Sequence, residues 1–170
     1  MSDFRYAAHG VPPYGPFNNW HLPYEDLKYK IEHEPWSLYI PPYRCAPHIW
    51  NVAGFVDTCS YLLDTGEGLI LIEAPCFNSL YLEFESIRQI GYDPHDIKWI
   101  FLTHDHGDHY GSARAIKEYT GAKIYLSRAD REEYEQQRDS GTLRESPYGH
   151  HTFEVDACYD DTNPLTIGRF

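Results

Sequence analysis

The stretch that decides the fold is an apolar run followed by a loop rich in polar ligand side chains, Trp99-Ile-Phe-Leu-Thr-His-Asp-His-Gly-Asp-His-Tyr-Gly111. A short apolar run such as residues 99–102 is typical of a buried strand. The loop after it has the pattern His-x-His-x-Asp-His, formed by His104, His106, Asp108 and His109. Loops that follow buried strands are where α/β proteins carry their functional side chains. The stretch therefore predicts an α/β body with a functional site at the end of a strand.

The spacing of these four residues, which we call the metal motif, predicts metal binding. Side chains at positions i and i+2 of an extended segment point the same way, so His104 and His106 can hold one ion. A turn after them would direct Asp108 and His109 toward a second ion. Imidazole is a good ligand for Zn²⁺, Fe²⁺ and Mn²⁺, and a carboxylate gives the second site a harder ligand. Two ions about 3.5–4 Å apart can share a bridging hydroxide, which is a nucleophile at neutral pH.

The sequence around the motif predicts a hairpin and then alternating strands and helices. A turn rich in Gly and Asp at 64–68 separates two apolar runs, which indicates a hairpin. Residues 79–90 have apolar side chains at helical spacing, and residues 128–138 form a strongly charged segment typical of a surface helix. This order favours an α/β layered body. We expect strands at 49–53, 58–63, 69–72, 99–102, 123–126 and 153–159 and the start of another at 164–167, helices at 79–90, 112–119 and 128–138, and a loop beyond 139.

The N-terminal region differs in composition from the rest of the chain. Residues 1–47 hold eight of the 12 prolines and many of the aromatic side chains. Proline at that density disfavours long helices and central strands. We therefore expect 1–47 to be an extended arm whose rings anchor it to a body formed by 48–170. Such an arm could also mediate a homo-oligomer contact.

The charge and the hydropathy of the chain exclude some partners. The 170 residues carry 26 acidic against 14 basic side chains, a net charge of −12, which disfavours nucleic acids and anionic membranes and favours a small-molecule substrate. Apolar runs long enough to span a bilayer are absent from the sequence. The N-terminal stretch Met1–Tyr6 lacks the basic and apolar regions of a secretory signal. We therefore expect a cytoplasmic location.

Two longer segments, TCSYLLDTGEGLILIEAP (58–75) and SIRQIGYDPHDIKWIFLTHDHGDHYGSARAIKEYTGAKIYLSRAD (86–130), resemble the metallo-β-lactamase superfamily. The resemblance covers about residues 36–170 and is closest to the third subclass of true metallo-β-lactamases. It implies an αββα sandwich, in which two mixed sheets have helices outside and a metal site at one edge. Of this sandwich the chain would form the N-terminal part.

The resemblance also assigns roles to the metal motif. His104 and His106 would bind a first zinc ion, and Asp108 and His109 a second. Asp108 would in addition orient the attacking hydroxide, which makes it the catalytic residue. The two ions would polarise a scissile carbonyl. The implied activity is that of a dinuclear zinc hydrolase acting on a small carbonyl substrate such as a β-lactam or a lactone.

Two departures from the family pattern leave alternatives open. Glu73-Ala74-Pro75 replaces the usual Asp-x-Gly, whose acid supports the site from behind the ligands. The third and last His ligands are expected beyond residue 170, so we expect a chain truncated before the second half of the sandwich, unless His150 or His151 supplies a ligand. An iron-dependent oxidoreductase of the sulfur dioxygenase type, with Fe or Mn in place of zinc, and an inactive fragment are the alternatives.

Overall fold

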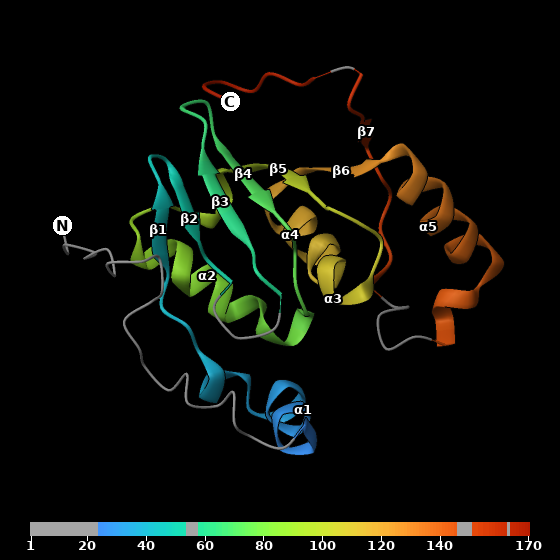
Figure 1. Cartoon of the computed structure of the whole chain (residues 1–170), viewed down its shortest axis with the longest axis horizontal. Helices are drawn as coiled ribbons and strands as arrows, with labels where there is room; N and C mark the ends of the chain where they lie inside the picture. The colour runs from blue at the N-terminus through green and yellow to red at the C-terminus, as the bar shows by residue number, and fades with distance from the viewer. Residues whose placement is uncertain (1–23, 54–57, 146–150, 163) are drawn as a thin grey trace.

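The structure is a computed structural model and describes residues 24–53, 58–145, 151–162 and 164–170. Its strands form one mixed sheet in the order β1-β2-β3-β4-β5-β6-β7 (Figure 1). Strands β1 to β4 pair antiparallel, and β4 to β7 pair parallel. The bounds are Tyr43–Ala46 for β1, Ile49–Asn51 for β2, Tyr61–Asp64 for β3, Leu69–Ile72 for β4, Ile97–Phe101 for β5, Lys123–Ser127 for β6 and Ala157–Tyr159 for β7.

The connecting helices lie on one face of this sheet. From β4 to β7 the strand order runs in one direction, and right-handed crossovers then place all connections on the same side. Figure 1 shows α2 and α4 together beneath the sheet and α5 beyond β6. The helix bounds are Tyr24–His33 for α1, Leu80–Gln89 for α2, Gly107–Tyr110 for α3, Ala113–Thr120 for α4 and Arg128–Ser140 for α5, with short 3-10 turns at Pro35–Leu38, Phe77–Ser79, Pro94–Asp96 and Thr142–Glu145.

The core lies between the sheet and these helices. Leu71, Ile100 and Ile124 form one rung across β4, β5 and β6, and all three are fully buried. They belong to the same apolar cluster as Ile87 of α2 and Ile116 of α4. Because side chains alternate along a strand, the neighbouring rung points to the opposite face of the sheet.

The predicted hairpin, α/β layering and central strands are confirmed. β3 and β4 pair antiparallel across the turn at 64–68. Two glycines that follow helices, Gly91 after α2 and Gly121 after α4, have φ of 91° and 77°. That left-handed conformation is where glycine commonly follows the last helical residue.

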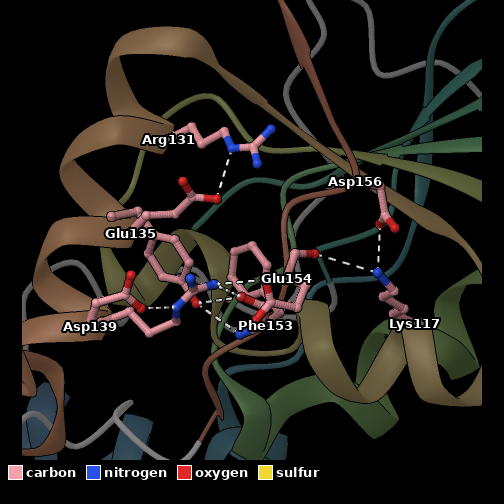
Figure 2. A network of polar contacts seen from close by, with 9 residues as sticks. Lys117, Arg131, Glu135, Asp139, Phe153, Glu154 and Asp156 are labelled. Atoms are coloured by element: carbon pink, nitrogen blue, oxygen red, sulfur yellow. Dashed lines mark hydrogen bonds and ion pairs between the residues drawn. The ribbon is translucent and has the colours of Figure 1, made fainter.

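Of three expectations for the C-terminal third, two hold only in part and one is wrong. The loop beyond 139 contains the end of α5 and a 3-10 turn at Thr142–Glu145. The strand at 153–159 shortens to β7, because the N–H of Phe153 donates to the Tyr134 hydroxyl at 2.8 Å instead of to a strand. Figure 2 shows Phe153 among the side chains of α5. A strand at 164–167 is absent from the described residues, since Ile167 and Phe170 close a turn on each other.

Part of the predicted arm is also not extended. Residues 24–33 form α1, a ten-residue helix, because the prolines at 23 and 35 flank this segment and do not interrupt it. The amide of Asn78 donates to the carbonyl oxygen of Ile31 at 2.6 Å, which ties α1 to the start of α2. Residues 1–23 lie outside the described part of the chain, and the division at 47/48 stays a prediction.

Of the helices described, none is both long and apolar enough to cross a membrane.

Candidate metal centre

The metal motif lies at the edge of the sheet where β4 and β5 end. These strands are parallel neighbours, so their carboxyl ends lie at the same edge. The N–H of Glu73, directly after β4, donates to the carbonyl oxygen of Phe101 at 2.9 Å. The N–H of Leu102, directly after β5, donates to the carbonyl oxygen of Tyr125 at 3.0 Å. Backbone hydrogen bonds therefore fix the point at which the chain leaves β5 for the motif.

The backbone of the motif is first extended and then helical. His106 has φ −82° and ψ 143° and precedes α3, which begins at Gly107. The N–H groups of His109 and Tyr110 both donate to the His106 carbonyl, at 2.9 and 3.2 Å. This is the change of direction expected from the spacing, with two histidines before the turn and Asp108 and His109 within it.

The structure brings the side chains of the motif together. The ring centroid of His104 lies 4.6 Å from that of His106 and 4.0 Å from that of His109. Asp108 Oδ2 lies 3.6 Å from His109 Nε2. The side chains of Asp108 and His109 are 46% and 25% exposed, so a solute can reach them.

Glu73 holds the motif from behind. Its buried carboxylate accepts a hydrogen bond from the N–H of Thr103 at Oε1 and lies beside His109 Nδ1 at Oε2, both at 2.8 Å. With φ of 69°, it adopts a conformation uncommon for a residue with a side chain. A proton on Nδ1 that is shared with Glu73 leaves Nε2 of His109 free as a ligand atom. Glu73 thus occupies the supporting position implied by the family resemblance.

Close packing of the β4–α2 loop against α3 completes this arrangement. The N–H of Ala74 donates to the His109 carbonyl at 2.9 Å, and the N–H of Ser112 donates to the Ala74 carbonyl at 3.1 Å. A Cβ atom at Gly111 would lie only 3.0 Å from the Gly107 carbonyl and 3.3 Å from the Pro75 carbonyl. Glycine at position 111 therefore permits the approach of the loop that carries Glu73.

The donor set fits a divalent metal, although it is not a complete ligand sphere. Two ligands on a tetrahedral zinc ion are about 3.3–3.4 Å apart, given bond lengths of about 2.0–2.1 Å. The 3.6 Å between Asp108 Oδ2 and His109 Nε2 is close to that separation. Among the residues described, however, no three His, Cys, Asp or Glu side chains converge closely enough to hold an ion. The described residues thus bring candidate ligand atoms together in pairs and not in a group of three.

Several neighbouring residues have other environments. His150 lies outside the described residues, and His151 stacks on Phe77 with ring centroids 4.7 Å apart. Asp105 Oδ2 lies 3.4 Å from the side-chain amide of Gln137 on α5. Burial, together with nearby Glu133, raises the pKa of Asp105. Asp105 therefore faces α5 and does not extend the ligand pairs.

Sequence reasoning missed one contact within this site. The hydroxyl of Thr103 lies 2.9 Å from Nδ1 of His104, so the ring is held at the nitrogen opposite Nε2. The only available signal was its position directly before the motif, and a threonine in that place has no distinctive pattern.

The fold and the site define a class of α/β protein that carries a His- and Asp-rich motif directly after one parallel strand and a buried supporting acid after the neighbouring one. Within that class the chain belongs to the metallo-β-lactamase superfamily, whose family model matches residues 53–165. The resemblance seen in the sequence is thereby confirmed, and with it the mixed α/β fold. The superfamily is one of metal-dependent hydrolases, so a divalent metal cofactor is implied for this chain.

Similar structures and a curated relative agree with this assignment. The metallo-β-lactamase GOB-18 from Elizabethkingia meningoseptica is 28% identical with a TM-score of 0.66, over 79% of this chain and 50% of that one. BJP-1, a subclass B3 metallo-β-lactamase of Bradyrhizobium japonicum, is 25% identical with a TM-score of 0.68, over 79% and 51%. A UPF0173 metal-dependent hydrolase of Staphylothermus marinus is 44% identical over 62 residues, which are 36% of this chain and 25% of the relative. The chain thus spans about half the length of these two solved lactamases.

Proposed function

We propose that this chain carries the metal-binding half of a dinuclear zinc hydrolase that acts on a small carbonyl compound, a β-lactam or a lactone. The observation that carries the proposal is the clustering of the metal motif at one sheet edge. There the His104 ring lies 4.0 Å from the His109 ring, and Asp108 Oδ2 lies 3.6 Å from His109 Nε2. Similarity to two metallo-β-lactamases supports the substrate class.

The residues of the motif divide between two ions in this proposal. His104 and His106 hold the first ion, and Asp108 and His109 hold the second. Bound zinc supplies an activated water and polarises the carbonyl of the substrate. The free carboxylate oxygen of Asp108 accepts a hydrogen bond from the attacking water and so orients it. Glu73 keeps His109 in the tautomer with Nε2 free.

The remaining ligands belong to the proposal as well. The described residues hold no group of three ligands, and the matched lactamases are about twice as long as this chain. We propose that the further His ligands follow residue 170 and that the 170 residues alone bind metal weakly. The charge of −12 favours a small substrate over a polyanion.

Metal analysis of the motif variants tests the ligand assignment. We expect His104→Ala and Asp108→Asn to lower zinc binding by at least about tenfold in equilibrium dialysis, because each removes a direct ligand. His95→Ala is the matched control, since His95 stacks on Tyr119 away from the motif. Unchanged zinc stoichiometry in both motif variants would refute the assignment. A chain that takes up iron and consumes oxygen would favour the oxidoreductase alternative.

Hydrolysis assays test the substrate class. We expect the 170-residue chain to hydrolyse a chromogenic cephalosporin and an aryl lactone only slowly, and a chain that continues beyond Phe170 to be faster by orders of magnitude. Rapid turnover by residues 1–170 would show that further ligands are not needed. A longer, zinc-loaded chain that hydrolyses neither compound would contradict the proposed substrate class.

A further inference from the structure

Tyr159, the last residue of β7, contacts the backbone at the start of the metal motif. Its hydroxyl donates to the carbonyl oxygen of Leu102 at 2.7 Å, across 57 residues of sequence. Leu102 is fully buried and lies between the end of β5 and Thr103. Its N–H is already bonded to Tyr125 of β6. Both backbone polar groups of Leu102 are therefore held, one from β6 and one from β7.

The Leu102 carbonyl controls the direction in which the motif leaves the sheet. Rotation of this peptide plane would turn Thr103 and His104 away from Glu73, which binds the Thr103 N–H. A buried carbonyl that lost its partner would also carry a desolvation cost, so the phenol favours one orientation of the plane. The contact thus acts on the backbone from which the first two histidines project.

β7 is fixed well enough to serve as an anchor. Asp156, directly before it, accepts a hydrogen bond from Lys117 of α4 at 2.6 Å (Figure 2) and another from the N–H of Ile124 at 2.8 Å. Ser127 pairs with Tyr159 in the β6–β7 register. The Tyr159 ring packs at a tilt on Phe101, with centroids 5.9 Å apart. The phenol therefore approaches Leu102 from an element that is held independently of the motif.

The charges around the phenol keep it a hydrogen-bond donor. Burial raises the pKa of Tyr159, and nearby Asp130 and Glu73 raise it further. The phenol, whose ordinary pKa is about 10, is consequently protonated and able to donate at neutral pH.

We propose that Tyr159 is a positioning residue for the metal motif, acting through the Leu102 carbonyl. This inference rests on the proposed function, because it assumes that His104 and His106 bind metal. Loss of the hydroxyl should loosen the segment 103–106 and weaken metal binding while the sheet stays folded. Outer groups that orient ligands typically contribute about 10–100-fold to metal affinity.

Tyr159→Phe tests the proposal, with Tyr92→Phe as the matched control. Each variant removes one phenol hydroxyl and keeps its ring. Tyr92 donates to Asp64 Oδ2 at 3.2 Å at the opposite edge of the sheet, near the β3–β4 turn. Affinity for Co²⁺ is measured from the visible absorption of the 170-residue chain. Amide hydrogen exchange of 103–106 is measured separately in the metal-free chain.

We expect Tyr159→Phe to bind Co²⁺ about tenfold more weakly and to speed exchange at 103–106 by about tenfold, with neither change in Tyr92→Phe. Unchanged affinity and exchange in Tyr159→Phe would overturn the proposal. Equal losses in both variants would overturn it too, because they would reflect general destabilisation. A wild-type chain that binds no Co²⁺ would count against the proposed function, and the exchange data would still decide whether Tyr159 orders this segment.

Discussion

At the scale of single residues, Glu73 links the fold to the metal motif. Its two carboxylate oxygens serve different partners, the N–H that follows β5 and the ring of His109. Its φ of 69° lies in the left-handed region, which is uncommon for a residue with a side chain. One buried acid thereby holds both the exit of the chain from β5 and the Nδ1 side of the His109 ring.

Exchanging this acid tests that double role. In Glu73→Gln the amide has one acceptor oxygen for two donors, Thr103 N–H and His109 Nδ1–H. We expect zinc affinity to fall by about 10–100-fold and the free energy of unfolding by about 1–3 kcal/mol. Glu73→Asp keeps the charge and tolerates positive φ better, so it should retain more of the affinity. Competition with a chromophoric chelator measures the zinc affinity. A Glu73→Gln variant whose zinc affinity equals that of wild type would contradict the supporting role of Glu73.

A second buried acid, Glu83 of α2, gives a pH dependence. It is fully buried, accepts a hydrogen bond from Ser60 and has a second oxygen without a partner among the described residues. Burial raises the pKa of Glu83 from 4.5 to about 8. Between these two pH values the folded chain therefore keeps the proton on Glu83, whereas the unfolded chain has lost it. Its contribution to stability is full below pH 4.5 and is lost as the pH rises toward 8.

We expect the free energy of unfolding of the metal-free chain to fall from pH 4.5 to pH 8 through this group, by at most about 1.4 kcal/mol per pH unit. Glu83→Gln should flatten that slope and be more stable than wild type at pH 8. Glu85→Gln, an exposed change on the same helix, is the control and should keep the slope. Urea titrations between pH 4.5 and pH 8 measure the free energy of unfolding. If its pH slope in Glu83→Gln equals that of wild type, Glu83 is not the source of the pH dependence.

Site residues that share a recognisable spacing could be predicted from the sequence. Residues whose neighbours are determined by the register of paired strands could not. His104, His106, Asp108 and His109 could be proposed because their spacing matches ligand chemistry, and their role as ligands stays a prediction. Tyr159 could not be placed near Leu102 without the pairing of β5, β6 and β7. That pairing brings together residues 57 positions apart, and no local signal encodes it.

At the scale of elements, the residue at which a helix or strand begins or ends depends on side-chain contacts. The local sequence pattern indicates these contacts only in part. Helix α5 was expected because of its composition, and its first turn is capped by Ser127, whose hydroxyl accepts from the Asp130 N–H at 3.1 Å. Helix α1 was missed because prolines nearby suggested extended chain. The strand expected at 164–167 is absent from the described residues because the N–H of Ile167 bonds to the Phe170 carbonyl at 2.7 Å instead of to a neighbouring strand.

The cap of α5 provides a test at this scale. Ser127→Ala removes the acceptor for the Asp130 N–H and should lower the free energy of unfolding by about 1 kcal/mol. Ser140→Ala, at the other end of the same helix, removes a hydroxyl that donates to the Gln137 carbonyl and should cost less. Thermal unfolding followed by circular dichroism compares the two. Equal effects would show that the cap does not determine the start of the helix.

At the scale of the whole molecule, the two faces of the sheet differ. Helices cover the face that carries Leu71, Ile100 and Ile124. The alternate rung, Ile72, Phe101 and Tyr125, points the other way and is only partly buried, although Phe101 and Tyr125 stack at 4.6 Å. Parallel strands occur almost only in sheets with both faces covered. The family resemblance implies a second sheet packed on this face, and we therefore expect the face to be an apolar surface available for association in the 170-residue chain.

Self-association should therefore depend on this face of the sheet. We expect the sedimentation coefficient of the 170-residue chain to rise with concentration and the chain to bind a hydrophobic dye. Tyr125→Lys places a charge on this partly buried rung, so it should shift the chain toward monomer, with its helical content retained. Tyr81→Lys is the control, because Tyr81 is 51% exposed on α2, on the helical side.

A wild-type chain that stays monomeric without binding dye would show that the chain covers this face itself. Association lost in Tyr81→Lys alone would instead favour contacts through α1, which Asn78 ties to the start of α2.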